Sequence, residues 1–377
     1  MSLIFINHPL ETFTPTASGA LATILWECCR VAQRQGLSPA VITRSSTISR
    51  FSWQNTTVLD YPEPPSGGPM LTVLRLQRKV TGWNHLCHKA YAIRVAAAVR
   101  ALPEAPLVLI NDPEMTIFLR RQFPQRRIVH WFENQQECRP RVQRQYASAA
   151  SVTLGVSNFT SEWVKQYYAV GVVPTLYNGV DTDQFCPAGA LPDPPIINFV
   201  GRTGIEKAPD LLLKAALSIA KTNRKFSVQL VGSNHWDRFE LDTYQRELGE
   251  LVAQLESRGI SVMRPGHVGR KDLPCQFRKA SIHVVPSRWD EPFGLTTVEG
   301  MASGLAVVAS NTGGTPEVVG NAGALFERDS VDGLAGALLP LVENRTERAK
   351  MGSMARVRSL EFTWDRTWNE LRGHAGV

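Results

Sequence analysis

Several features that mark membrane, secreted or fibrous proteins are missing from this sequence. No apolar run approaches the roughly 18–20 residues that span a bilayer. Residues 1–13 lack the basic stretch and cleavage site of a secretory signal, and no low-complexity tract or fixed-period repeat occurs. We therefore expect a globular protein that stays in the cytosol. A chain of 377 residues exceeds one ordinary hydrophobic core, which predicts two domains of about 150–200 residues.

Motifs of other protein classes are missing as well. The segment that follows the first apolar stretch, 7–11, has no Gly-x-Gly-x-x-Gly set, which argues against an NAD-dependent oxidoreductase. The excess of basic residues comes with no recognition motif of a nucleic-acid-binding module, so no nucleic-acid partner is expected. Scattered cysteines without a Cys-x-x-Cys pair predict reduced thiols rather than disulfides or a zinc site. They are Cys28, Cys29, Cys87, Cys138, Cys186 and Cys275.

The net charge of +7 is concentrated in the first half of the chain. Residues 1–190 hold 18 Lys and Arg against 12 Asp and Glu, whereas the remainder holds 23 against 22. Within this half, segment 75–94 mixes cations with aromatic residues, as interfacial helices do, although Gly82 interrupts it. Three explanations stay open: an anionic acceptor, peripheral contact with the anionic inner face of a membrane, or solubility alone.

Short apolar runs alternate with helix-length segments throughout the chain. This alternation predicts an α/β protein with buried parallel strands. The expected strands of the first half are 3–6, 40–43, 107–110, 127–130 and 152–156, with a helix over 21–30. Those of the second half are 196–200, 227–231, 261–263, 282–285 and 305–308, with a helix over 210–221.

A Pro-rich stretch, 186–195, separates the two series and is the predicted linker. Two α/β sheets joined by such a hinge would hold a ligand in a cleft at the carboxyl ends of their strands.

The strongest chemical signal lies in 287–304. A loop carrying Glu291, a candidate catalytic residue expected to point toward the same space as Glu299, follows the strand 282–285, and a helix is expected to begin near Gly294. The first N–H groups of a helix have no intrahelical partner and favour anions, so the amides of Phe293, Gly294 and Leu295 are candidate ligands for phosphate or sugar oxygens. Glu299, about one turn into the helix, would accept hydrogen bonds from a vicinal diol such as ribose.

Two glutamates separated by seven residues, with Phe-Gly after the first and Met-Ala-x-Gly-x-x-Val-Val after the second, resemble the donor motif of the retaining family-4 glycosyltransferases (glycosyl transferases group 1). The resemblance implies a GT-B fold, two Rossmann-like doubly wound domains facing across a cleft. It also implies transfer of a hexose-type sugar from a nucleotide diphosphate sugar, UDP-linked, with retained anomeric configuration. The nucleotide sugar is then a co-substrate, and neither a cofactor nor a metal ion is expected.

Further segments extend this resemblance to most of the chain. Residues 177–185 are similar to the segment before the hinge of these enzymes, and 362–365 to the entry of a terminal helix that returns to the first domain. The implied domains are 1–187, completed by 361–377, on the acceptor side and 188–360 on the donor side. Val268 is a candidate contact for the nucleotide base, and the turn 313–317 is expected to be architectural.

Arg202 and Lys207 follow the first strand of the second domain. The resemblance gives them the role of a clamp on the donor phosphates, where two cations stabilise the departing diphosphate without a metal ion. The family usually has Gly after this Lys, whereas the present chain has Ala208.

Two candidates come from the first domain. The resemblance implies that His130, at the end of strand 127–130, lies near the donor sugar and orients it; the alternative is a capped structural histidine. Gly19 would let backbone amides approach the diphosphate, or belong to a plain helix-entry turn. The competing interpretations of the whole chain are another GT-B enzyme, such as a sugar phosphorylase or a trehalose-type synthase, and a non-catalytic nucleotide-sugar-binding protein.

Overall fold

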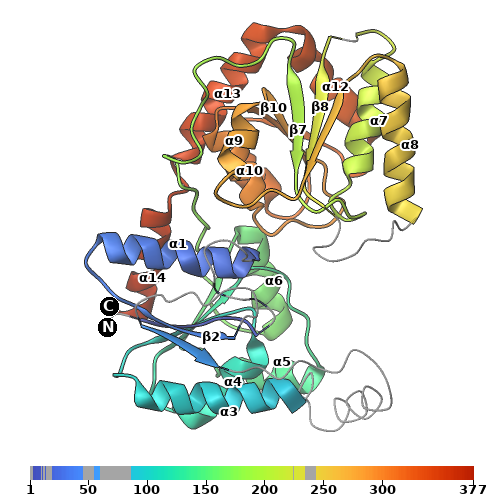
Figure 1. Cartoon of the computed structure of the whole chain (residues 1–377). Helices are drawn as coiled ribbons and strands as arrows, with labels where there is room; N and C mark the ends of the chain where they lie inside the picture. The colour runs from blue at the N-terminus through green and yellow to red at the C-terminus, as the bar shows by residue number, and fades with distance from the viewer. Residues whose placement is uncertain are drawn as a thin grey trace. The chain divides into compact units, whose positions relative to one another are not determined.

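A computed structural model describes residues 3–9, 11, 13, 19–45, 55–59, 86–223, 225–233 and 243–377, with residues 86 and 87 described by their backbone only. The chain divides into two compact units (Figure 1). The first comprises residues 1–177 together with 364–377, and the second comprises 178–363. Segment 75–85 of the cationic stretch and residues 14–18 before the first helix lie outside the described residues.

The first unit is a parallel sheet with helices on both faces, and its strand order is β3-β2-β1-β4-β5-β6. Its elements are β1 (Ile4–Ile6), α1 (Ala20–Arg34), β2 (Ala40–Arg44), β3 (Thr56–Leu59), α3 (Leu86–Ala101), β4 (Leu107–Ile110), α4 (Pro113–Gln122), β5 (Ile128–Phe132), α5 (Pro140–Tyr146), β6 (Val152–Gly155), α6 (Asn158–Tyr168) and α14 (Trp364–Ala375).

Alternation along β1 explains how the two faces of this sheet are covered. Ile4 and Ile6 pack into a core with Tyr91 of α3 and Met115 of α4, because successive side chains of a strand point to opposite faces. Phe5, between them, contacts the ring of Trp368 in α14, at 6.3 Å between ring centroids. Helices α1 and α14 lie side by side, and α3 and α4 lie on the other side of the sheet (Figure 1).

The second unit repeats the plan, with strand order β12-β11-β10-β7-β8-β9. Its elements are β7 (Ile196–Val200), α7 (Pro209–Ile219), β8 (Ser227–Val231), α8 (Thr243–Ser257), β9 (Val262–Gly266), α9 (Leu273–Arg278), β10 (Ile282–Val285), α10 (Leu295–Ala302), β11 (Ala306–Ser310), α11 (Thr315–Val319), β12 (Ala324–Phe326), α12 (Val331–Glu343) and α13 (Arg345–Ser359).

Both orders are those of a doubly wound Rossmann-like sheet, so the predicted α/β class is confirmed. In each sheet the first strand lies between its second and fourth strands, which makes a switch point at β1/β4 and another at β7/β10. Loops leaving the carboxyl ends of these strands diverge and leave room for a ligand. Among the described residues, no helix is both long and apolar enough to cross a membrane.

Candidate functional site

The loops that follow β7 and β10 meet at the switch point of the second unit, because these two strands pair directly. Lys207 comes from the first loop and Glu291 from the second, and the Lys207 Nζ lies 2.5 Å from the Glu291 Oε1. The same carboxylate oxygen accepts a hydrogen bond from the Ser287 hydroxyl. The Lys207 ammonium also lies over the Trp289 ring, 5.1 Å from its centroid. Two of the sequence-predicted site residues are therefore in direct contact.

The environment of Glu291 keeps its carboxylate ionised. Burial alone raises the pKa of this group, which is 4% exposed, but the charge of Lys207 and the hydrogen bonds from Lys207 and Ser287 outweigh it and bring the pKa below its ordinary value. The Lys207 ammonium, in the loop after β7, is therefore partly buried and held in one position by the ionised Glu291 carboxylate.

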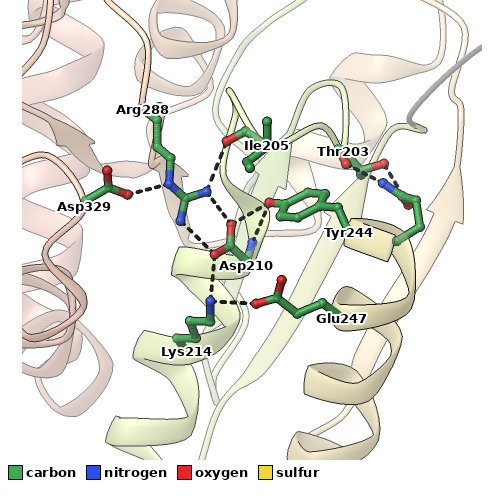
Figure 2. A network of polar contacts seen from close by, with 9 residues as sticks. Thr203, Ile205, Asp210, Lys214, Tyr244, Glu247, Arg288 and Asp329 are labelled. Carbon is green, nitrogen blue, oxygen red and sulfur yellow. Dashed lines mark hydrogen bonds and ion pairs between the residues drawn. The ribbon is translucent and has the colours of Figure 1, made fainter. Parts of the chain in front are cut away.

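A network of polar contacts around Arg288 connects the loop after β7 with the loop after β10 (Figure 2). The Arg288 guanidinium donates two hydrogen bonds to the Asp210 carboxylate, of 2.7 and 2.8 Å, and one of 3.1 Å to the carbonyl of Ile205. Asp210 also accepts from the Tyr244 hydroxyl, and from the Lys214 Nζ at 3.0 Å. Bidentate pairs of this kind define both distance and orientation.

Further members extend this network at both sides. The Nε of Arg288 donates to Asp329, and Lys214 also bonds to Glu247 at 2.8 Å. Burial raises the pKa of Asp210, but the hydrogen bonds from Arg288, Tyr244 and Lys214 dominate and bring it well below its ordinary value. The loop 201–208 is thus attached to the first turn of α7 and to the loop after β10.

The backbone of the Glu291 loop is held by the glycine turn that follows β11. The amide of Gly314 donates to the carbonyl of Glu291 at 2.6 Å. At Gly313, where φ is +55°, a Cβ would lie only 2.4 Å from that same oxygen. Glycine is needed here because both the backbone conformation and the close approach exclude a side chain. The turn 313–317 therefore acts on the site through the position of Glu291.

Helix α10 begins where the sequence predicts. Gly294 is its N-cap at a φ of +84°, and no side chain caps the amides of the first turn. Phe293 is buried and its ring packs against Phe362, with the centroids 5.6 Å apart. Leu295 is the first helical residue. In the part of the chain that the structure describes, the first amides of α10 therefore have no N-cap side chain as an acceptor.

Glu299 is almost fully buried in α10, and its two carboxylate oxygens differ. Oε1 accepts a hydrogen bond of 2.7 Å from the Nη1 of Arg270, whereas Oε2 is buried without a partner among the described residues. Burial raises the pKa of Glu299 above its ordinary value, although the charge of Arg270 opposes the shift. A buried acceptor without a partner costs free energy unless a ligand completes it.

Arg202 and Val268 lie in the more open part of the loops. The Arg202 side chain is 61% exposed, and its guanidinium lies 3.7 Å from the carboxylate of Glu206. Val268 is half-buried in the loop between β9 and α9, two residues before Arg270. Ala208, where the resembled family usually has Gly, adopts a left-handed φ of +52°, a conformation that glycine adopts more readily.

Sequence reasoning missed Arg270, Arg288 and Asp210. Arg288 lies inside the recognised motif and Arg270 beside the base-contact candidate, but neither has a sequence pattern that specifies its carboxylate partner. Those partners are 29 and 78 residues away along the chain.

The structure favours the structural alternative for His130. β5 continues to Phe132, so His130 lies inside a central strand, between β4 and β6, and is 0% exposed. Its Nε2 accepts the amide of Asp112 at 3.0 Å, and its Nδ1 is 2.8 Å from the Tyr146 hydroxyl. Burial lowers the pKa of His130 to about 3. A neutral, fully bonded core histidine does not fit the predicted role near the donor sugar.

Gly19 fits the alternative of a helix-entry turn. The carboxylate of Glu11 accepts the amide of Ala22 at 2.8 Å, in the first turn of α1. A Cβ on Gly19 would lie 2.5 Å from the Glu11 carboxyl group. This helix start is therefore occupied by an anion of the chain itself, which argues against the predicted approach of Gly19 to a diphosphate.

Acid should destabilise both units through buried neutral histidines. Burial also lowers the pKa of His283 in β10 to about 3. In the unfolded chain each of these histidines binds a proton near pH 6.5, whereas in the folded chain it does so only near pH 3. The stability of the folded chain is therefore unaffected by them above pH 6.5 and falls as the pH decreases from 6.5 toward 3. We expect the free energy of unfolding to fall by up to about 1.4 kcal/mol per pH unit for each histidine.

Urea unfolding at a series of pH values between 7.5 and 5 measures this effect. His130→Gln and His283→Gln should each flatten the pH dependence, because glutamine remains neutral. His267→Gln, at an exposed position, is the matched control. An unchanged slope in both buried variants would contradict the prediction.

No metal centre is evident in the part of the chain that the structure describes, since no three His, Cys, Asp or Glu side chains are grouped to hold an ion. The chain contains one Asp-x-Asp triplet, Asp181–Asp183. The first carboxylate of this triplet accepts the amides of Asp183 and Gln184, both at 3.1 Å, as in an Asx turn.

Known proteins resemble the chain in both sequence and fold. Residues 182–358 match the family model described as "Glycosyl transferases group 1". Spore coat protein SA of Bacillus subtilis is 24% identical over 323 residues, which cover 78% of this chain and 85% of that protein. The D-inositol 3-phosphate glycosyltransferase of Corynebacterium aurimucosum is 30% identical over 202 residues, 49% of this chain and 47% of that enzyme. The aligned region thus spans about half the length of that relative.

Solved structures resemble the fold over nearly the full length of the chain. Anabaena Alr3699/HepE in complex with UDP has a TM-score of 0.73 at 18% identity, covering 98% of each chain. Its complex with UDP-glucose has a TM-score of 0.68 at 17% identity, covering 99% of this chain and 98% of that one. At these identities the likeness establishes the fold, which is the predicted GT-B type. The sequence match to the glycosyl transferases group 1 family model extends over residues 182–358, just under half of the chain.

Proposed function

We propose that the chain is a retaining glycosyltransferase of family 4 that moves a hexose-type sugar from a UDP-sugar to an acceptor. The observation that carries the proposal is the pair of features at the carboxyl edge of the second sheet. One is the Lys207–Glu291 ion pair, and the other is the buried, unpartnered Oε2 of Glu299. The Lys207 ammonium, with the exposed Arg202 of the same loop adding a second positive charge, suits a diphosphate, and the Glu299 oxygen suits a ribose hydroxyl. Relatives and structural neighbours named as glycosyltransferases or as UDP complexes agree with it.

In this proposal the residues act mainly through charge and position. The uncapped amides at Gly294 and Leu295, with Arg202 and Lys207, bind the diphosphate and stabilise the negative charge that grows on it as the bond to the anomeric carbon breaks. Glu291 holds the Lys207 ammonium in place. Val268 contacts the base.

The acceptor hydroxyl attacks from the face that the diphosphate leaves. Its oxygen forms the new bond to the anomeric carbon while its proton passes to the departing phosphate oxygen. No separate side-chain base is required, which is consistent with a neutral, buried His130 in a structural role.

Binding of the donor nucleotide tests this proposal most directly. UDP should raise the melting temperature of the chain, because a ligand that binds only the folded state stabilises it. Glu299→Gln should weaken UDP binding about tenfold or more, since it replaces a charged hydrogen-bond acceptor at the proposed ribose site. Isothermal titration calorimetry measures both.

The matched control is Glu250→Gln, at an exposed position of α8 in the same unit. UDP affinity that is unchanged in Glu299→Gln would refute the ribose assignment. A chain that binds no nucleoside diphosphate at all would refute the proposed function. Once transfer is observed, the proton NMR spectrum of the product should show the donor's anomeric configuration.

A further inference from the structure

The first unit contains a cavity of about 290 Å³ that the donor site does not use. It lies at the switch point between β1 and β4, the position where doubly wound sheets bind ligands. His8 follows β1, and Asn111 and Asp112 follow β4. The segment 136–139 before α5 completes the wall. All of the residues that line it belong to the first unit.

The cavity wall is held in place by hydrogen bonds. Asp112 is the N-cap of α4, where its carboxylate accepts the amide of Met115 at 2.9 Å and lies 3.2 Å from the Nε2 of His88. The hydroxyls of Tyr168 and Tyr167 donate to the carbonyls of Gln136 and Cys138, at 2.6 and 2.7 Å. Such a wall is formed before any ligand arrives, which lowers the entropic cost of binding.

Asn111 provides an unused donor at this cavity. Its side chain is 3% exposed, its Oδ1 accepts the amide of Glu133 at 2.8 Å, and its Nδ2 has no partner among the described residues. The residue is also held at a φ of +52°, a conformation that costs a non-glycine residue free energy. Asn111 lines the cavity, so a ligand oxygen there would supply the missing acceptor.

The charges around the cavity do not favour an anion. His88 and Asp112 form an ion pair whose charges cancel. Burial lowers the pKa of His88 but Asp112 more than restores it, and the pKa of Asp112 lies below its ordinary value. Burial lowers the pKa of His8, so that ring is neutral. Among the described residues, the remaining charged side chains of the wall are two carboxylates, on Glu114 and Glu137, and one guanidinium, on Arg139, a sum of −1.

The start of α4 does not change this balance. Its partial positive charge is already met by the Asp112 carboxylate, and Glu114 adds another anion in the first turn. A phosphate group would therefore meet a helix start that is occupied and a wall of net negative charge.

We propose that this cavity binds an uncharged polyhydroxylated group, an unphosphorylated sugar or cyclitol ring of the acceptor. Hydroxyls donate to the carboxylates of Glu114 and Glu137 and accept from the Nδ2 of Asn111 and from Arg139. The inference rests on the proposed transferase function and narrows its acceptor. The proposed group also differs from the phosphorylated inositol that appears in the name of several relatives. Of the three explanations left open for the basic first half, the cavity argues against the anionic acceptor.

Matched ligand pairs test the inference on the full chain. Three pairs are compared: glucose with glucose 6-phosphate, mannose with mannose 6-phosphate, and myo-inositol with inositol 3-phosphate. Saturation-transfer NMR and calorimetry measure the affinity of the chain for each compound, with UDP present. At least one uncharged compound should bind about tenfold or more tightly than its phosphate, since one like charge at close range is worth about 1.4 kcal/mol or more. Tighter binding of the phosphates, or binding of no compound, overturns the inference.

A charge-reversed variant locates the binding in this cavity. The double variant Glu114→Lys/Glu137→Lys changes the net charge of the described cavity wall from −1 to +3. It should therefore bind the phosphorylated compounds more tightly than the uncharged ones. Unchanged binding of the uncharged compound in this variant would also overturn the inference. UDP binding is measured on the same samples. If UDP binds and the sugar preference fails, the cavity assignment alone is wrong, whereas failure of UDP to bind refutes the proposed function.

Discussion

Replacing Arg202 with alanine should lower kcat for sugar transfer by about 100-fold or more, with little change in melting temperature. A guanidinium aimed at a departing diphosphate stabilises charge that develops only in the transition state, and loss of one such group typically costs about 10²–10³ in rate. The side chain is 61% exposed, and its ion pair with Glu206 is 3.7 Å long. Its removal therefore leaves the packing of the second unit intact.

The control for this experiment is Arg246→Ala, which removes an exposed arginine of α8 in the same unit. Steady-state kinetics with a UDP-sugar that the chain transfers gives kcat, and differential scanning calorimetry gives the melting temperature. Near-normal turnover in Arg202→Ala would remove this residue from the site. Loss of activity together with a large fall in melting temperature would show that it acts on folding instead.

Replacing Arg288 with alanine should destabilise the second unit by about 3 kcal/mol, because breaking a buried ion pair leaves the other charge without compensation. The residue left behind is Asp210, which is 2% exposed and takes two hydrogen bonds from Arg288 (Figure 2). Lys214 and Tyr244 retain their bonds to Asp210, which limits the loss.

A neighbouring pair supplies the matched control. Arg328 and Asp290 also form an ion pair, but both side chains are substantially exposed, so Arg328→Ala should cost no more than about 1 kcal/mol. Urea unfolding of Arg288→Ala, Asp210→Asn and the double variant gives the coupling energy of the buried pair. Equal costs for Arg288→Ala and Arg328→Ala, or a coupling energy near zero, would show that the network does not hold the loops.

Catalysis should respond to the same substitution. Arg288 donates its backbone amide to the carbonyl of Glu206 and its side chain to the carbonyl of Ile205, and so it holds the loop that carries Arg202 and Lys207. At a temperature where Arg288→Ala remains folded, kcat should fall because the two cations are no longer held in place. Arg288 is a positioning residue in this view.

Strands that are buried on both faces could be predicted from sequence alone. β4, β7, β8 and β10 have the bounds expected from their apolar runs. β3 and β12 were missed because they are edge strands with partly exposed side chains and no continuous apolar run. The end of β5 was placed too early, and that error turned a core histidine into a candidate for the site.

The amino-acid sequence by itself determined the doubly wound fold and the position of the Glu-x7-Glu motif, because buried strands, helix starts and this spacing are local patterns that one chain segment carries. Tertiary structure alone decided which charges meet. Arg270 with Glu299, Arg288 with Asp210, and His88 with Asp112 join segments that lie 24 to 78 residues apart. Tertiary structure also decided the charge of the cavity in the first unit. Its described wall is net negative, although residues 1–190 as a whole are net positive. The physical reason is that pKa values, ion pairs and binding depend on distance and burial, which only the packed sheet and its loops define.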